Sequence, residues 1–207
     1  MDEQRALQVL QELIEQGRVA DPQSARGKLL HAATHLFRSH GFERTTVREL
    51  ASTMGIQSGS LFHHYKSKDE ILRAVMEQAL IYHLALMQAS LEGIDDVRQR
   101  VLALIRCELH SILGNSGEAM AVLVYEWRSL SEEGRVQVLA LRDQYEQQWL
   151  AVLAQAQAAG LLKGDLFIAR RFLTGALSWT STWFHPHGSL SLDQLAEEAL
   201  KLVLKDG

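Results

Sequence analysis

Only two prolines, Pro22 and Pro186, occur in 207 residues, so almost the whole chain lacks the residue that most strongly breaks helices. Apolar residues recur at helical spacing along this length, and no stretch shows the alternation typical of a β-strand. The sequence therefore predicts an all-α chain of sequential helices joined by short loops. The expected helices span residues 3–17, 21–39, 46–54, 58–64, 69–91, 95–113, 118–130, 133–159, 165–184 and 191–204.

Two of these helices are short and are separated by a glycine. Thr46 precedes Glu49 by three residues, which is the spacing of a capping box that opens the first short helix. Gly55 ends this helix, because glycine readily adopts the left-handed conformation at a helix terminus. Ser58 is the expected cap of the second helix. Two short helices joined by a glycine turn are typical of a helix-turn-helix.

The helix expected over residues 69–91 begins at a second capping box, formed by Ser67 and Glu70. It is too long to serve only the small helical module that precedes it. We therefore expect it to connect that module to the rest of the chain. The amphipathic segment at residues 3–17 precedes the module and is assigned no chemistry.

Charge is distributed unevenly along the chain. The net charge is −4, but residues 24–68 contain seven lysines and arginines against two acids, which makes this stretch +5 and the remainder −9. A basic module on an acidic body suits local binding of phosphate groups. No apolar run is long enough to cross a bilayer, and the N-terminus is unlike a signal peptide. The single cysteine, Cys107, excludes an internal disulfide, so we expect a cytoplasmic protein.

The stretch from residue 41 to residue 72 resembles the tetracycline-repressor (TetR) family of bacterial transcription regulators. The residues that carry the resemblance are Gly41-Phe42, Thr45-Thr46-Val47, Leu50-Ala51, Gly55, Gly59-Ser60-Leu61-Phe62, His64-Tyr65, Lys68 and Ile71-Leu72. Phe62 stands where the family has a tyrosine, which removes a hydroxyl but keeps an aromatic ring. The resemblance implies an N-terminal extension (1–20), a three-helix DNA-binding domain (21–70) and a helical domain for ligand binding and dimerisation (71–207).

The second short helix is the expected reader of the major groove, with short side chains at its N-terminal end. Gln57, Ser58 and Ser60 are expected to reach base edges, and Gly59 allows close approach of the backbone. His63 and His64 are expected to contact bases or phosphates, and Phe62 to contact the groove or pack in the core. The expected phosphate anchors are Thr45, Thr46, Tyr65, Lys66 and Lys68.

One short helix reads few bases, and the family solves this by binding a palindromic operator as a homodimer. The last two helices resemble the family's dimer surface. Their apolar stripes contain Ala176, Leu177, Trp179 and Thr180, and Leu195, Ala199, Leu202 and Val203. We expect each helix to divide its faces between this surface and the core of its own chain.

A weaker resemblance links the C-terminal region to TetR regulators that respond to acyl-coenzyme A thioesters and repress lipid or steroid catabolism. It rests on residues 126–130, on Arg142-Asp143 with Tyr145, and on Trp179, Trp183-Phe184, Pro186 and Gly188. The resemblance implies a large, partly apolar, anionic effector. The expected ligand-binding residues are His83, His110, Trp127, Arg128, Trp149 and Trp179. Core packing and salt bridges between helices remain alternative explanations for these aromatic and charged residues.

Two alternatives to an effector-controlled repressor are a helical enzyme and a DNA-binding dimer without an effector. The sequence contains no nucleophile elbow, phosphate-binding loop or metal-ligand cluster, so we expect neither enzymatic activity nor a cofactor. His31 and His35 lie four residues apart on one helix, and His185 and His187 flank Pro186. Neither pair has a third ligand at fitting spacing, and we predict no metal site.

Overall fold

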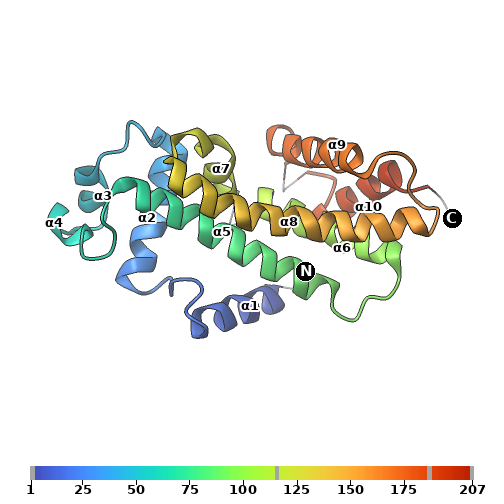
Figure 1. Cartoon of the computed structure of the whole chain (residues 1–207), viewed down its shortest axis with the longest axis horizontal. Helices are drawn as coiled ribbons and strands as arrows, with labels where there is room; N and C mark the ends of the chain where they lie inside the picture. The colour runs from blue at the N-terminus through green and yellow to red at the C-terminus, as the bar shows by residue number, and fades with distance from the viewer. Residues whose placement is uncertain (1–2, 115–116, 186–187, 206–207) are drawn as a thin grey trace. The chain divides into compact units, whose positions relative to one another are not determined.

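The computed structural model describes residues 3–114, 117–185 and 188–205, and within these ranges it consists of helices and loops without a strand (Figure 1). The prediction of an all-α fold is confirmed. The helices are α1 (Glu3–Glu15), α2 (Ala25–His40), α3 (Val47–Thr53), α4 (Ser58–Leu61), α5 (Lys68–Leu91), α6 (Val97–Leu113), α7 (Gly117–Tyr125), α8 (Glu132–Ala158), α9 (Leu166–Trp179) and α10 (Leu192–Val203). Two short 3₁₀ helices, η1 (Trp127–Ser129) and η2 (Thr180–Thr182), follow α7 and α9.

The helix starts agree with the predicted capping residues at some positions and differ at others. Helix α2 begins at Ala25 and not at residue 21, because Ser24 Oγ accepts a hydrogen bond from Gly27 N and acts as the cap. Helix α5 begins after Ser67, whose hydroxyl accepts a hydrogen bond from Glu70 N as predicted. The Glu70 carboxylate completes the cap by accepting a bond from Lys66 N, one residue earlier than a capping box requires.

The chain divides into two compact units. The helix-turn-helix (HTH) unit contains residues 8–82 and 116–142, and the C-terminal unit contains residues 1–7, 83–115 and 143–207. Consequently α1, α5 and α8 each contribute residues to both units. None of the helices among the described residues is long and apolar enough to cross a membrane.

The HTH unit is built on α2, which packs against α3 and α7. Leu29, Ala33 and Phe37 are buried on one side of α2 and belong to the same apolar cluster as Leu50 of α3 and Leu61 of α4. Helix α1 adds Val9 and Leu13 to the buried apolar residues. A hydrogen bond of 2.7 Å from Ala20 N to the Gln78 side chain connects the loop after α1 to α5.

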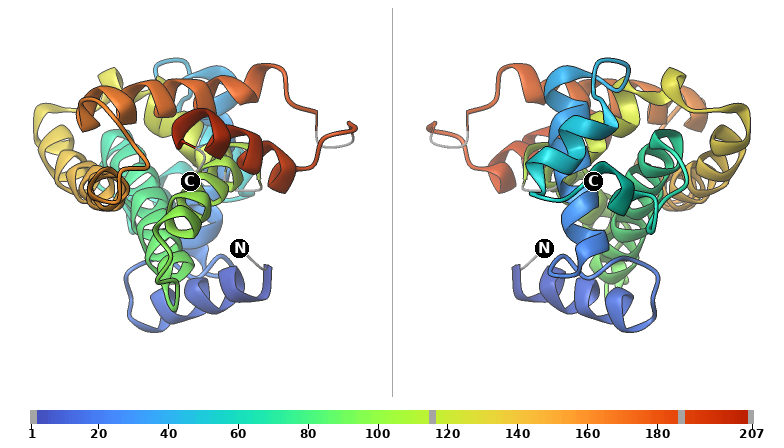
Figure 2. Two further views of the ribbon diagram at one scale, coloured as in Figure 1. Left: turned by 90° about the vertical axis from the view of Figure 1, so that its right-hand side faces the viewer. Right: turned by 90° about the vertical axis from the view of Figure 1, so that its left-hand side faces the viewer.

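The C-terminal unit is organised around α6, which packs against both α9 and α10 (Figure 2). Its buried apolar residues include Leu104 and Ile105 of α6, Leu153 of α8, Leu173 of α9 and Leu200 of α10. Helix α10 begins with a capping box in which Ser191 and Gln194 bond each other's backbone N–H. One apolar side of each of these helices is thus buried within this unit.

Candidate nucleic-acid interface

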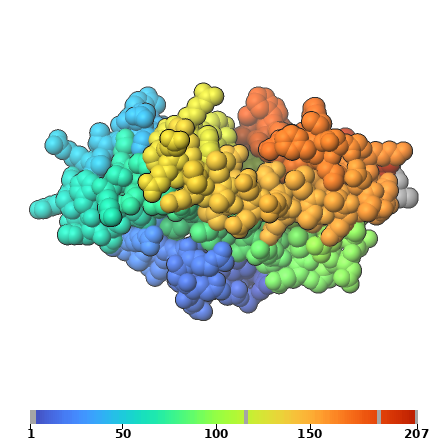
Figure 3. Space-filling view, viewed as in Figure 1, coloured from blue at the N-terminus to red at the C-terminus, as the bar shows by residue number. Residues whose placement is uncertain are grey.

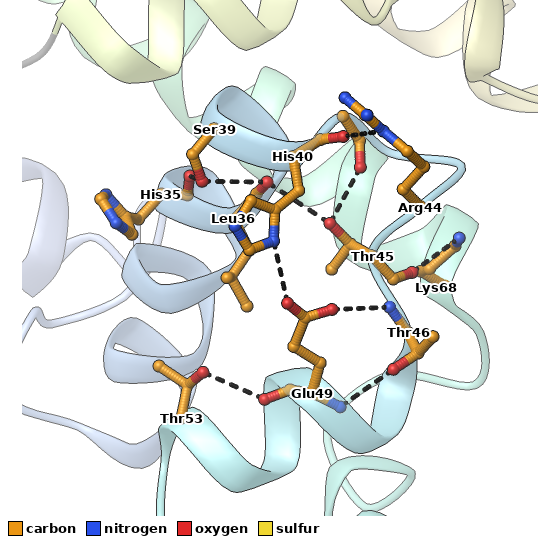
Figure 4. Close-up of polar contacts among 11 residues, drawn as sticks. His35, Leu36, Ser39, His40, Arg44, Thr45, Thr46, Glu49, Thr53 and Lys68 are labelled. Atoms are coloured by element: carbon orange, nitrogen blue, oxygen red, sulfur yellow. Dashed lines mark hydrogen bonds and ion pairs between the residues drawn. The ribbon is translucent and has the colours of Figure 1, made fainter.

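Hydrogen bonds to the two oxygens of the Glu49 carboxylate hold the N-terminus of α3 in place (Figure 4). Thr46 Oγ1 accepts a hydrogen bond of 3.1 Å from Glu49 N, and Glu49 Oε2 accepts one of 3.4 Å from Thr46 N. The predicted capping box is therefore present. The other carboxylate oxygen lies 2.9 Å from His40 Nδ1 at the end of α2. Glu49 thus connects the end of α2 to the start of α3.

The turn after α3 is formed by Gly55, whose φ of 67° lies in the left-handed region that favours glycine. The helix that follows is shorter than expected and ends at Leu61 instead of residue 64. Gln57, and not Ser58, occupies the N-cap position, and its side chain makes no capping bond. The Gln57 amide is exposed and remains available for contacts outside the protein.

The residues expected to read bases lie together at the start of α4. Gln57 and Gly59 are exposed, and Ser58 and Ser60 are partly exposed. Leu61, the next residue, is buried in the core of the HTH unit and fixes α4 against α3. Phe62, His63 and His64 continue the exposed surface past the end of the helix.

The five expected phosphate anchors have different environments. Thr46 and Lys66 are exposed, as a phosphate contact requires. The Thr45 side chain is fully buried, and its hydroxyl donates to Gly41 O at 2.9 Å. The prediction for Thr45 is therefore corrected, because a buried hydroxyl cannot reach a phosphate and instead holds the loop before α3.

Tyr65 and Lys68 also make contacts inside the HTH unit. The Tyr65 ring is buried, and its hydroxyl accepts a hydrogen bond of 2.8 Å from Arg26 Nε. Lys68 Nζ donates to the backbone carbonyls of Phe42 and Thr45. Both side chains thus have structural partners in the protein without DNA.

Arg44 and Arg48 were not singled out as contacts from the sequence, although both belong to the basic stretch. Arg44 Nε donates to His40 O at 2.6 Å, which holds the side chain beside the start of α3 (Figure 4). Arg48 is exposed on α3 itself. The local charge of +5 was the only sequence signal for these two cations. It could not single them out, because charge alone does not show which side chains are exposed.

Comparison with known proteins gives matches over both parts of the chain. Residues 29–75 match the model described as "Bacterial regulatory proteins, tetR family", and residues 95–206 match "Tetracyclin repressor-like, C-terminal domain". The chain belongs to the TetR family. It is a DNA-binding transcriptional regulator and not an enzyme.

One curated relative agrees with this assignment by its name, and two solved structures share the fold. The HTH-type transcriptional repressor KstR2 of Rhodococcus jostii is 32% identical over 186 residues, covering 86% of this chain and 89% of KstR2. A crystal structure described as superantigen pfit is 66% identical, with a TM-score of 0.87 over 97% of this chain and 100% of that one. The structure of AibR with isovaleryl coenzyme A and operator DNA shares the fold at 21% identity, with a TM-score of 0.80 over 89% of this chain and 100% of that one.

The residues expected to bind the effector of this TetR-family regulator fall in different units. Trp127 and Arg128 belong to the HTH unit, and the other four belong to the C-terminal unit. The Arg142 guanidinium stacks on the Trp127 ring at 4.8 Å, and the Arg128 side chain is exposed. Pro186 and His187 lie outside the described residues.

Within the C-terminal unit the four expected ligand residues differ in exposure. Burial lowers the pKa of His83 to about 4, so this side chain is neutral at pH 7. Burial also lowers the pKa of His110. Trp179 is 66% exposed, whereas Trp149 is fully buried and donates through Nε1 to Glu108 at 2.8 Å. Trp149 therefore has a structural partner inside this unit, and its role in ligand binding stays a prediction.

A buried polar cluster that sequence analysis did not identify surrounds Trp149. Glu108 Oε2 accepts hydrogen bonds from Tyr145 Oη and Trp149 Nε1, both at 2.8 Å. Arg170 Nη2 lies 3.3 Å from the same oxygen and 3.3 Å from Glu146 Oε1. Burial, followed by the charge of Glu108, raises the pKa of Tyr145 well above its usual value. The sequence signal for this cluster was a charged residue within an otherwise apolar helical stripe, Glu108 in α6 and Arg170 in α9. This signal does not show which charged residues pair with each other.

Proposed function

We propose that this TetR-family regulator is a repressor that binds a palindromic operator as a homodimer and dissociates from it when a small-molecule effector binds. In this proposal residues 21–70 bind DNA, and residues 71–207 bind the effector and form the dimer. The observation that carries the proposal is the exposed polar start of α4, residues 57–60, held by the capped helix α3. The name of KstR2 as a transcriptional repressor supports the direction of regulation.

Two classes of contact are expected at the operator. Gln57, Ser58, Gly59 and Ser60 face base edges, and the Gln57 amide suits adenine because it both donates and accepts. Thr46, Lys66, Arg44 and Arg48 are exposed around them and bind phosphates. Phe62, His63 and His64 border the groove at the end of α4.

One face of α9 supports dimer formation. Ile168, Phe172 and Trp179 lie on this face at helical spacing and are exposed, Phe172 by 77%. The opposite face, with Leu173 and Leu177, is buried within the C-terminal unit. Figure 3 shows α9, in orange-red, open on the molecular surface. Exposed aromatic residues at this density typically form a protein–protein interface.

The structure also changes which apolar residues are available for the dimer. Leu177, Thr180 and Leu195, expected at this surface, are buried in the core of their own unit. Trp179 of α9 and Leu202 of α10 are exposed, Leu202 by 90%. We therefore place the dimer contact on the exposed face of α9 and on Leu202.

The effector that best agrees with these observations is an acyl-coenzyme A thioester. AibR, which shares the fold, is described in complex with isovaleryl coenzyme A and operator DNA. Within the HTH unit, Arg128 and the Trp127–Arg142 stack offer positive charge, donors and aromatic surface. These groups suit an anionic ligand with an apolar portion.

The experiment that tests the proposal is a mobility-shift titration of the full chain on the DNA upstream of its own gene. Gln57→Ala should weaken binding to the operator but not to random DNA, whereas Gln147→Ala, on the exposed side of α8, should change neither. Acyl-coenzyme A thioesters of increasing chain length should release the DNA, with free coenzyme A and free fatty acids as controls. Equal affinity of the wild type for operator and random DNA would contradict the proposal, and DNA release by none of the thioesters would contradict the effector class.

A further inference from the structure

Lys68, the first residue of α5, uses its ammonium group inside the HTH unit. Nζ donates to Phe42 O at 2.8 Å and to Thr45 O at 3.0 Å, and it lies 4.1 Å from the centre of the Phe42 ring. Two of its three N–H groups are thus bonded to carbonyls that precede α3, and the ring adds a cation–π contact. The ammonium group has exchanged much of its hydration for contacts within the protein.

The loop that Lys68 holds determines where α3 begins. Thr45 N donates to Gly41 O and Phe42 O, each at 3.2 Å, so the loop forms a tight turn. Thr45 is the residue directly before Thr46, the N-cap of α3. The carbonyl that Lys68 binds therefore belongs to the peptide unit that orients Thr46 (Figure 4). A change in this peptide unit would move the capping box and the first turn of α3.

The position of α4 depends on that of α3, because the two helices pack against each other. The contacts of Lys68 thus affect the base-reading residues through α3, although Lys68 lies outside both helices.

We propose that Lys68 is a positioning residue for DNA recognition, which fixes α3 and α4 for the major groove through Phe42 O and Thr45 O and does not neutralise a phosphate. Lys66, two residues earlier, is exposed and is the matched phosphate contact. The two lysines therefore affect operator binding by different physical routes.

The salt dependence of operator binding separates these routes. Each phosphate contact contributes about 0.9 to the slope of log K against log salt, so a homodimer that loses one per protomer loses about 1.8. Lys66→Met should reduce the slope by this amount. Lys68→Met should lower affinity by about tenfold per protomer, the loss expected for hydrogen bonds to a charged group, while leaving the slope unchanged. A slope that falls by about 1.8 in Lys68→Met would overturn the proposal.

A second measurement uses the full chain without DNA. Lys68→Met should accelerate hydrogen exchange at the amides of Glu49 and Leu50, which are bonded to Thr46 in the first turn of α3. Lys66→Met should leave this exchange unchanged, because its side chain does not hold the loop. If Lys68→Met unfolds, Lys68→Gln, which keeps a donor without the charge, replaces it in both measurements. Wild-type exchange at Glu49 and Leu50 in a folded Lys68 variant would also overturn the proposal.

Discussion

Replacement of Arg170 by methionine tests how the C-terminal unit stabilises its buried charges. Arg170 is 1% exposed and Glu108 is 6% exposed, and their charged groups lie 3.3 Å apart. The guanidinium also stacks on the Trp149 ring at 4.4 Å. Methionine fills a similar volume without charge, so the change leaves the Glu108 carboxylate with only the Tyr145 and Trp149 hydrogen bonds. Removing one partner of a buried ion pair costs about 3–5 kcal/mol, a large fraction of the ~5–15 kcal/mol stability of a typical domain.

The assay is urea unfolding at pH 7.5, followed by circular dichroism at one protein concentration. Arg171→Met is the matched control, because Arg171 is exposed on the same helix, and its effect should stay within about 0.5 kcal/mol. The double variant Arg170→Met with Glu108→Gln should recover part of the stability, since it removes the unpaired charge. A loss below about 1 kcal/mol would refute the reasoning.

Three further predictions concern other parts of the chain. Phe172→Glu should convert the dimer to a monomer in sedimentation analysis, whereas Arg171→Glu should not; a dimeric Phe172→Glu variant would exclude this face of α9. Ser131→Ala should lower the free energy of unfolding by about 1 kcal/mol, because Ser131 Oγ accepts from Gly134 N at the start of α8 and donates to Asp69. Its operator affinity should be unchanged, and an unaltered melting temperature would contradict the capping role. The Cys107 thiol, whose pKa burial raises to about 12, should resist iodoacetamide at pH 8 until urea unfolds the chain; rapid labelling of the folded protein would show that the thiol is accessible.

The all-α fold and the helix-turn-helix were predictable because their signals are local. The capping box at Thr46 depends on residues three apart, and the turn at Gly55 depends on one backbone conformation. Such interactions form between neighbours in sequence and need no knowledge of the tertiary contacts. The same reasoning failed at the start of α4, because Ser58 is a favourable cap residue but is already the first residue of the helix, and Gln57 at the N-cap position makes no side-chain capping bond.

The sequence by itself determined the helical architecture, the capped α3 and the polar residues that begin α4. Only the tertiary structure decided that Thr45 is buried, that Lys68 binds two carbonyls before α3, and that Glu108 meets Arg170 62 residues away along the chain. The local sequence around a basic or hydroxyl side chain looks the same whether that side chain contacts a phosphate or a backbone carbonyl. Its role depends on which distant atoms the packed core brings within hydrogen-bond distance, and this information is not contained in the local pattern.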